Sequence, residues 1–494
     1  MKSASAKPAS VHPAMVDTYK REWLHPDAVY APMLRYNMAH LIAAAEKGVV
    51  PQAAAAALVK EMAVLVAGGP DQIPQDMELD GLQPNIEAEL SRRLGAEIGG
   101  WLNTGRARQE CEFVARQIAN RDRLGPLIGE VTGLCAVLLD LADQERETVM
   151  PYATWAQHAE PITFGYYAAA LAEGVIADLV RLRAAYQGLS RCRADIGQVV
   201  PPPLSIDRQR VAGLLGFETI MGNSLYAYAS LDSEMQVLSV LAILMGGLAR
   251  ASENLFVWSS PEYGFLRFGK AFSGTSYLMP QKRNPYALRM VRPVAAQMVG
   301  AWNDSIQLFT GGLPLVGNGL IHISNRLMES LDAAAQVVHL LALALPSLEL
   351  DRPRMRRLAQ NHWAQAPQLV YLLVCEHTLS FRIAHHAVAK VVNYAVAAGI
   401  NPSALDASIV EGAVQEVTGR KIRIPQESVS QALDASHVVD SRGDSGPAPE
   451  AVAIHVARMR NSLAELTDWL GSERGRIAAA GCRLKAAAEQ LTSG

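Results

Sequence analysis

Long apolar periodicity at helical spacing is the feature that most limits what this chain can fold into. The clearest apolar stripe recurs at steps of three, four and seven residues and consists of Val237, Leu241, Leu244, Leu248 and Leu255. This spacing places the side chains on one side of a long helix. Other apolar and small residues surround the stripe, so burial on several faces is expected. The pattern predicts a helix in the interior of a bundle.

Similar patterns recur along the chain, whereas the alternating patterns typical of strands are scarce. Further helical stretches are expected at 112–146, 163–189, 285–310 and 326–345. The run Ser-Glu-Met-Gln from Ser233 has the form of a capping box, which predicts a helix start there. Half of the residues are apolar and only 6% are aromatic, a composition that suits packed helices better than a twisted sheet. The sequence predicts an all-α fold.

Interruptions of the helical pattern divide the chain into three expected parts. They are an N-terminal helical domain at 1–105, a central helix bundle at 106–350 and a C-terminal helical domain at 351–494. Polar stretches rich in Gly, Pro, Ser or Asp are expected to form loops. These stretches lie at 71–82, 198–203 and 440–449.

Composition argues against several classes of function. The net charge is −3, from 45 basic and 48 acidic residues, so no nucleic-acid partner is expected. The five cysteines are scattered without metal-ligand spacing, which predicts buried apolar residues in a reducing compartment. No signal-peptide pattern is visible, and the longest uncharged apolar run, 15 residues at 235–249, is too short to span a bilayer. We therefore expect a cytoplasmic protein without a membrane partner.

The segment 274–285 carries most of the functional information. It reads Gly-Thr-Ser-Tyr-Leu-Met-Pro-Gln-Lys-Arg-Asn-Pro, and its glycine and small hydroxyl residues let the backbone move and approach a ligand. A serine acts as a base only if its oxyanion is held by a positive charge or by N–H donors. Lys282, six residues after Ser276 on a loop that can close, is one way to meet that need. By composition alone, a plain surface connection is the more common explanation.

The segment resembles the serine loop of the aspartase/fumarase superfamily, whose pattern is Ser-Ser-x-x-Met-Pro-x-Lys-x-Asn-Pro. The residues in register are Ser276, Met279, Pro280, Lys282, Asn284 and Pro285. Tyr277 takes the place of the second serine. Within the superfamily the chain is most similar to argininosuccinate lyase, with further matches at 104–108, 150–161 and 380–385.

The resemblance implies a fumarase/aspartase-like subunit of three domains with a central long-helix bundle and a serine loop near 264–285. It also implies a homotetramer with active sites shared between subunits. The implied reaction is a reversible β-elimination from an N-substituted aspartate, which gives fumarate and an amine without metal or organic cofactor. In this reaction Ser276 is the base, Lys282 stabilises the developing charge and Asn284 holds a carboxylate oxygen. The partner is thus a small dicarboxylate or amine substrate.

The resemblance implies a wider set of substrate-binding residues as well. They are Thr104, Arg106, Arg108, Gln109, Thr154, Gln157, His158, Asn318 and His322. The two arginines suit carboxylates, although a structural ion-pair role stays open for one of them. His158 is either the general acid for the leaving amine or a histidine outside the site. His322 is either a substrate contact or a structural residue.

Departures from the family pattern cluster at positions that recognise the amine. Three family histidines are replaced by Gln83, Asn103 and Trp155, and a substrate-binding serine by Asn37. Gln109 and Glu110 replace an Asn-Asp pair, and Gly317, His322 and Asn325 replace a Tyr, a Gln and a Lys that grip the amino-acid end. Loss of these partners would leave substrate charges unpaired. Argininosuccinate is therefore not the expected substrate. Trp155 is expected to fill the volume of the lost histidine rather than stack on the leaving group.

Three functions stay open on the sequence. The favoured one is a C–N lyase whose leaving group is not arginine. The second is another elimination of the superfamily, including argininosuccinate cleavage, adenylosuccinate-type cleavage or a C–O elimination. The third is a non-catalytic homologue, against which the joint presence of Ser276, Lys282 and Asn284 argues.

Overall fold

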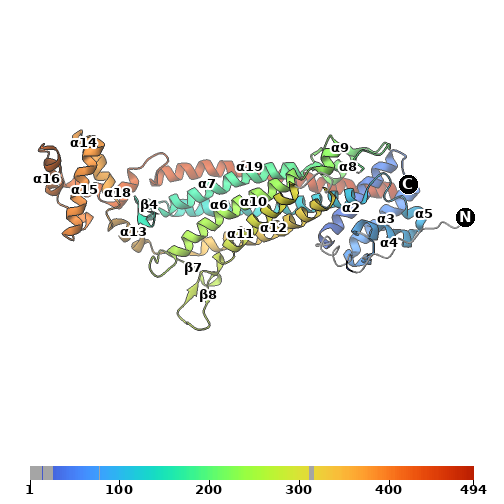
Figure 1. The fold of residues 1–494 in the computed structure, drawn as a ribbon, viewed down its shortest axis with the longest axis horizontal. Coiled ribbons are helices and arrows are strands. Elements are labelled where there is room, and N and C mark those ends of the chain that lie inside the picture. The colour runs from blue at the N-terminus through green and yellow to red at the C-terminus, as the bar shows by residue number, and fades with distance from the viewer. Residues whose placement is uncertain are drawn as a thin grey trace.

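The computed structural model describes Ala14 and residues 26–76, 78–79, 81–197, 199–310 and 316–493, with the backbone alone at 26 and 316–318. Helices dominate, and they form an elongated molecule with a central bundle and a smaller helical group at each end (Figure 1). The predicted all-α class is confirmed.

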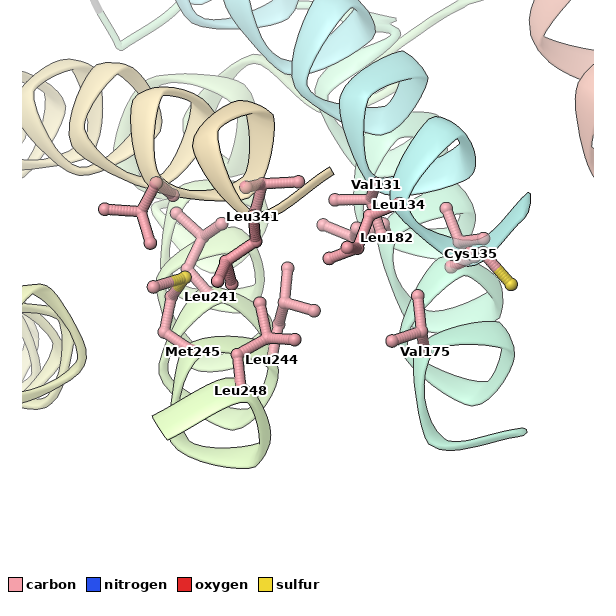
Figure 2. Close-up of a cluster of buried hydrophobic side chains, with 14 of the residues drawn as sticks. Val131, Leu134, Cys135, Val175, Leu182, Leu241, Leu244, Met245, Leu248 and Leu341 are labelled. Atoms are coloured by element: carbon pink, nitrogen blue, oxygen red, sulfur yellow. The ribbon is translucent and has the colours of Figure 1, made fainter. Parts of the chain in front are cut away.

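Five long helices form the central bundle. They are α6 (Arg108–Gln144), α7 (Phe164–Leu189), α10 (Asp232–Trp258), α11 (Val291–Phe309) and α12 (Val316–Ala344). Helix α6 packs against α7 and α12, and α10 packs against α7 and α11. Their apolar stripes face one another, so that Leu134, Leu241 and Leu341 belong to one buried core (Figure 2). The predicted stripe of α10 is thus part of the bundle interior.

The N-terminal group has a second apolar core. Its elements are α2 (Pro26–Glu46), α3 (Gln52–Gly68), η1 (Pro70–Gln72), α4 (Leu82–Leu94) and α5 (Ala96–Gly99), joined by α8 (Arg208–Leu215); α9 (Ser224–Ala229) follows α8. The first turns of α6 contribute Val114 and Ile118 to this core. Because α6 takes part in both cores, it ties the N-terminal group to the bundle.

The C-terminal group is a third packed unit. It contains α13 (Arg352–Gln360), α14 (Ala366–His377), α15 (Phe381–Ala397), η6 (Pro402–Ala404), α16 (Ala407–Thr418), α17 (Gln426–Ala432) and α18 (Ala435–Asp440). Its own core spans Leu369 to Leu433.

The last helix, α19 (Pro449–Ser493), runs back along the bundle (Figure 1). It packs on α6 and α7 and then on α3 and α8. Leu470 lies in the bundle core and Leu484 in the N-terminal core. The three-part division of the chain stays a prediction, and the packing of α19, like that of α6 and α8, crosses its expected boundaries.

Among the described residues, strands are short and pair two by two. The pairs are β1 (Val149–Met150) with β4 (Ile162–Thr163), β2 (Ala153–Thr154) with β3 (Gln157–His158), β5 (Arg191–Cys192) with β6 (Thr219–Ile220), β7 (Leu266–Phe268) with β10 (Leu348–Leu350), and β8 (Gly274–Thr275) with β9 (Arg283–Asn284). Only β5–β6 is parallel. Short 3-10 turns complete the connections: η2 (Lys270–Phe272), η3 (Tyr286–Leu288) and η5 (Leu345–Ser347).

Two local expectations are wrong. Helix α10 begins at Asp232, with Leu231 at the N-cap position and no side-chain cap, so Ser233 lies inside the first turn and cannot cap the helix start. The cysteines are all free, but Cys375 and Cys482 are exposed rather than buried. The expected loop at 440–449 is confirmed between the end of α18 and the start of α19.

Three helical segments are long and apolar enough to cross a membrane by length and composition. They are Arg108–Gln144, Asp232–Trp258 and Gly319–Ser347, and 50%, 56% and 50% of their most apolar windows are buried inside the protein. Their apolar character therefore serves the bundle core at least in part. The absence of a membrane partner stays a prediction.

Candidate active site

The segment that carries Ser276 is a β-hairpin that projects from the side of the molecule (Figure 1). Strands β8 and β9 pair Gly274 with Asn284 and Thr275 with Arg283. Ser276 follows β8 directly, and its Oγ accepts hydrogen bonds from the backbone N–H groups of Leu278 at 3.3 Å and Met279 at 3.1 Å. Two donors aimed at one hydroxyl oxygen would also stabilise that oxygen as an alkoxide. The loop thus supplies part of what a serine base requires.

Lys282 and Asn284 lie on the returning side of the hairpin. The backbone N–H of Lys282 donates to the Met279 carbonyl at 3.1 Å and closes the turn. The Lys282 side chain is exposed and forms no ion pair with any residue that the structure describes. Its ammonium group is therefore available to a negative charge near the hairpin.

Gly274 is expected from sequence to let the loop backbone move, and in the structure it allows a close packing contact. A side-chain carbon at this position would lie 2.0 Å from the ring of Tyr286, so the ring packs directly on the glycine backbone. Tyr286 begins η3, just after β9. The glycine is thus required for contact at the base of the hairpin.

A second candidate segment lies at the start of α6. The Thr104 hydroxyl donates to the Trp101 carbonyl at 2.8 Å, and Gly105 has a φ of +75°, a conformation that favours glycine. After this turn Arg106 points inward and is only 8% exposed. Its Nη2 donates to the Leu102 carbonyl at 2.5 Å, and its guanidinium lies 4.8 Å from the centre of the Tyr36 ring.

Arg108 and Gln109 follow on the first turn of α6. Arg108 is partly exposed, and the Gln109 side chain accepts from the Tyr228 hydroxyl at 2.7 Å. Of the two arginines in the motif, Arg106 is therefore the one held by interior contacts. Arg108 is half-buried on the first turn of α6, and its role toward a ligand stays a prediction.

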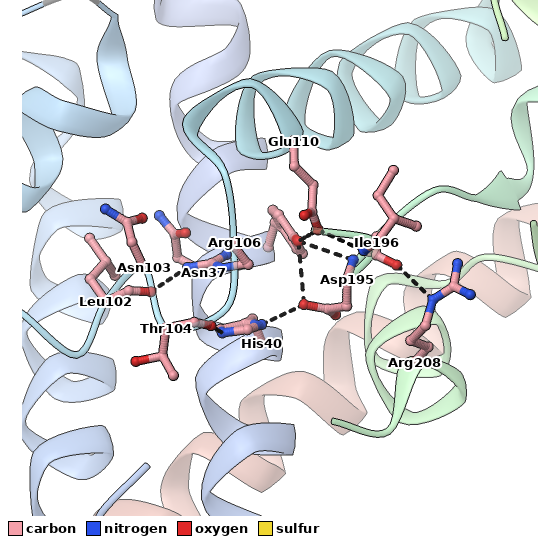
Figure 3. A network of polar contacts seen from close by, with 12 residues as sticks. Asn37, His40, Leu102, Asn103, Thr104, Arg106, Glu110, Asp195, Ile196 and Arg208 are labelled. Atoms are coloured by element: carbon pink, nitrogen blue, oxygen red, sulfur yellow. Dashed lines mark hydrogen bonds and ion pairs between the residues drawn. The ribbon is translucent and has the colours of Figure 1, made fainter. Parts of the chain in front are cut away.

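A buried polar network packs against this turn (Figure 3). His40 contacts Asp195 at 2.5 Å and the Thr104 carbonyl at 3.0 Å. The Tyr36 hydroxyl donates to Glu110 at 2.6 Å. Burial, followed by the nearby charge of Asp195, raises the pKa of Glu110 to about 8. Burial alone would raise the pKa of Asp195, but its contacts with His40 and the nearby arginine charges outweigh burial and lower it. The sequence did not single out this network, because no periodicity or motif links its members.

Three positions that depart from the family pattern lie together in a second network. Asn37 and Gln83 exchange side-chain hydrogen bonds at 2.9 and 3.2 Å. Gln83 also donates to Asn103 at 2.7 Å, and Asn103 donates to Glu87 at 2.7 Å. Each amide is both donor and acceptor, so these side chains satisfy one another in the interior. The departures at these positions therefore form one coherent structural unit.

The third candidate segment is the hairpin formed by β2 and β3. Its two-residue turn consists of Trp155 and Ala156, with φ values of +53° and +58°, which non-glycine residues adopt at a cost of about 1–2 kcal/mol each. Trp155 is 98% exposed. The expectation that its side chain fills an interior volume is therefore wrong for the single chain. His158, at the end of the hairpin, packs edge-on against His362 with ring centres 4.7 Å apart. Partial burial and the neighbouring His362 lower the pKa of His158.

The remaining predicted residues lie on α12. His322 is partly buried. Asn325 is buried and accepts from Arg116 at 2.5 Å. Asn318 lies where only the backbone is described, so its side chain falls outside the described residues. Across the part of the chain that the structure describes, no group of three or more His, Cys, Asp or Glu is placed to hold a metal.

A single chain does not bring the candidate segments together. Arg108 begins α6, and the hairpin with Trp155 follows its far end. Since α6 has 37 residues, its ends lie about 55 Å apart at 1.5 Å per residue. The serine hairpin projects from the bundle at a distance from the N-terminal group (Figure 1). The described chain thus holds the three segments apart, and a substrate that touches all of them requires more than one copy.

Comparisons with known proteins agree with this architecture. A family model described as Lyase matches residues 14–300, and one described as Argininosuccinate lyase C-terminal matches residues 363–440. Argininosuccinate lyase 1 of Shouchella clausii is 30% identical over 443 residues, which cover 88% of each chain. Argininosuccinate lyase of Methanoculleus marisnigri is 32% identical over 441 residues, again 88% of each chain.

Solved structures extend the similarity to the fold. EDDS lyase in complex with formate and an EDDS lyase variant with bound fumarate superpose with TM-scores of 0.84 and 0.85, at 25% identity over 98% of this chain and 97% of theirs. A class II fumarase from Schistosoma mansoni shares the fold, with a TM-score of 0.69 at 15% identity over 83% of this chain and 90% of its own. The protein is thus a carbon–nitrogen lyase with a fumarase-like fold, and its chain belongs to the argininosuccinate lyase family.

Proposed function

We propose that this protein cleaves an N-substituted aspartate into fumarate and an amine that is not arginine, and that Ser276 is the base. The observation that carries the proposal is the pair of backbone N–H donors on the Ser276 hydroxyl oxygen. They lower the energy of the alkoxide, which a serine must form before it can take a proton from carbon.

The reaction follows from the chemistry of the hairpin. The Ser276 alkoxide accepts a proton from the carbon next to a carboxylate, and the electron pair moves into that carboxylate. Lys282 and Asn284 meet the added negative charge through an ammonium group and an amide donor. The electron pair then returns from the carboxylate to form the carbon–carbon double bond, and the C–N bond breaks. The nitrogen leaves with the electrons of that bond and takes up a proton. Arg108 pairs with a substrate carboxylate.

The proposed assembly is a homotetramer in which several subunits build each site. It is supported by the length of α6, because no single chain spans the candidate segments. Large apolar side chains exposed on α10 and α11 also support it, since a soluble protein covers such surfaces with a partner. These residues are Ile243, Phe256, Val257, Val299, Trp302 and Phe309.

The leaving group is proposed to lack the charged amino-acid end of arginine. Asn325, which replaces a family lysine, is already engaged by Arg116, so it offers neither a positive charge nor a spare carbonyl oxygen. The exposed ring of Trp155 and the amide network around Gln83 favour an amine with an apolar or hydrogen-bonding body over one with a second charged end.

Replacement of Ser276 tests the base. The variant Ser276→Ala is expected to lose at least 10²-fold in the rate of fumarate formation, measured by ultraviolet absorbance. Its melting temperature should stay within about 2 °C, because the residue lies on a projecting hairpin and touches no core side chain. An unchanged rate would remove Ser276 from the role of base.

The reverse reaction identifies the amine. Protein incubated with fumarate and a panel of amines should yield an adduct of fumarate plus one amine, detected by mass spectrometry. Arginine belongs in the panel as the decisive comparison. Efficient formation of argininosuccinate would overturn the proposed leaving group and favour argininosuccinate cleavage. If no adduct forms and no succinyl adduct is cleaved, the result would favour a non-catalytic homologue.

A further inference from the structure

We propose that His40 is a positioning residue that fixes the substrate-binding turn between Thr104 and Glu110. The inference deepens the proposed function, because the turn carries Arg108, which we have assigned to a substrate carboxylate. His40 and Tyr36 lie one helical turn apart on α2 and reach both sides of that turn. His40 contacts the Thr104 carbonyl before Arg108 at 3.0 Å, and Tyr36 contacts Glu110 after it at 2.6 Å.

The two hydrogen-bond partners of the His40 ring define its positioning role. One ring nitrogen faces a backbone carbonyl, which only accepts, and the other faces the carboxylate of Asp195 at 2.5 Å. Each contact needs a proton between its two heavy atoms. The pair of His40 and Asp195 therefore holds one proton between them, and the second ring proton is given to Thr104. Both side chains are almost fully buried, at 0% and 3% exposed, so water does not replace either contact.

This contact controls the direction of the backbone. The Thr104 carbonyl precedes Gly105, whose φ of +75° turns the chain so that Arg106 enters the interior and Arg108 begins α6 at the surface. The Arg106 N–H closes the turn on the Asn103 carbonyl at 3.0 Å. If the carbonyl of Thr104 lost its donor, it would be a partly buried acceptor without this partner, and the turn would rotate to regain one.

Charged and titratable groups from several elements face His40 and Asp195. The groups that face the pair are Arg106 from the turn, Tyr36 from α2, Glu110 from α6 and Arg208 from α8. Arg208 donates to the carbonyls of Ala194 and Met221 and holds the Asp195 segment in place. The His40 ring is therefore fixed from one side by Asp195 and acts on the turn from the other.

Two amide variants separate the contacts. In His40→Gln the amide N–H₂ group lies near the position of the former Nε2 and can still donate to the Thr104 carbonyl. In His40→Asn the amide N–H₂ group lies near the position of the former Nδ1 and can donate only to Asp195. Each variant leaves one buried partner unsatisfied, so both are expected to lower the melting temperature by similar amounts. Fumarate affinity, measured by calorimetry on the full-length protein, should differ. We expect the Kd to stay within about threefold of the wild type in His40→Gln and to rise at least about tenfold in His40→Asn. His339→Asn, at an exposed histidine paired with Glu130, is the control and should leave the Kd unchanged.

Equal effects of the two amide variants on Kd would overturn the inference, because they would show that His40 acts through general stability. Hydrogen exchange over residues 101–110 supplies a second measurement that needs no ligand. Faster exchange in His40→Asn than in His40→Gln supports the positioning role, and equal exchange contradicts it. If the wild-type protein does not bind fumarate, the proposed function fails, and the exchange result alone decides the role of His40.

Discussion

At the residue scale, the carboxyl of Glu110 is a side chain whose charge depends strongly on folding. It is 1% exposed, one of its oxygens has no hydrogen-bond partner in the structure, and burial raises its pKa to about 8. Folded protein therefore keeps this proton up to about pH 8. The unfolded chain loses it near the ordinary value of 4.5.

This difference predicts how stability depends on pH. Between pH 4.5 and 8 the folded state binds one more proton than the unfolded state, so stability falls as pH rises, by up to about 1.4 kcal/mol per pH unit. The variant Glu110→Gln carries no such proton, and its melting temperature should be flatter between pH 5.5 and 8 than that of the wild type. Thermal melts at several pH values measure the slope. Glu349→Gln, at an exposed position of β10, should follow the wild type, and parallel curves for all three proteins would contradict the assigned pKa of Glu110.

Residue-level functions could be predicted from sequence only where a contiguous motif carries them. Ser276, Lys282 and Asn284 lie within nine residues, so one segment could be read as a unit. The contact between His40 and Asp195 joins residues 155 positions apart, and a buried pair of this kind has no local signature. The sequence could not distinguish Arg106 from Arg108 either, because the turn at Gly105 decides which side chain points inward.

At the element scale, the base of the serine hairpin depends on contact between the Gly274 backbone and the Tyr286 ring. A methyl group at Gly274 would lie 2.0 Å from a ring carbon, so one of the two must move. Ser276 is only two residues away, and displacements of about 1 Å at a reacting group cost about 10²-fold in rate. The Tyr286 ring is partly exposed and can shift toward solvent, so the fold itself should tolerate the change.

We therefore predict that Gly274→Ala lowers the rate of fumarate formation at least about 10²-fold while the melting temperature changes little. The double variant Gly274→Ala with Tyr286→Ala removes the clash and should recover part of the loss relative to Gly274→Ala alone. Tyr286→Ala by itself is the matched control. Wild-type activity in Gly274→Ala would show that the hairpin base is not constrained by this contact.

Helices could be predicted well because their signal is local and repeated. The stripe of α10 is in the bundle core, and the expected stretches at 163–189 and 112–146 correspond to α7 and α6. The capping box failed because the helix starts before Ser233, with Leu231 at the N-cap position. The hairpin at Trp155 was missed because its turn uses two non-glycine residues with positive φ, where sequence rules expect Asn or Gly.

At the scale of the whole molecule, length is the physical reason to propose shared sites. Helix α6 separates Arg108 from the hairpin with Trp155 by about 55 Å, a distance that no small substrate spans. The serine hairpin projects from the chain (Figure 1), and its tip residues Tyr277 and Leu278 are fully or largely exposed. Composition alone could not give this geometry, since it depends on which end of each long helix carries which segment.

Shared sites predict complementation between inactive variants. Arg108→Ala and Ser276→Ala each remove one contribution to a site. If these contributions come from different subunits, a mixed oligomer contains some sites with both residues intact. For random mixing, two independent contributions give about a quarter of the wild-type activity. The measurement is fumarate formation by co-expressed variants, compared with each variant alone.

A second pair of variants makes the test specific to the arrangement of segments. Ser276 and Asn284 lie on the same hairpin, so a mixture of Ser276→Ala and Asn284→Ala leaves every hairpin with one defect. That mixture should stay inactive, even though its oligomers form as readily as those of the first pair. Recovery in both mixtures would indicate a trivial cause such as exchange of genetic material or residual activity. Recovery in neither mixture would mean that Arg108 and Ser276 act within one chain or do not act at the same site. The length of α6 and the position of the hairpin argue against both outcomes.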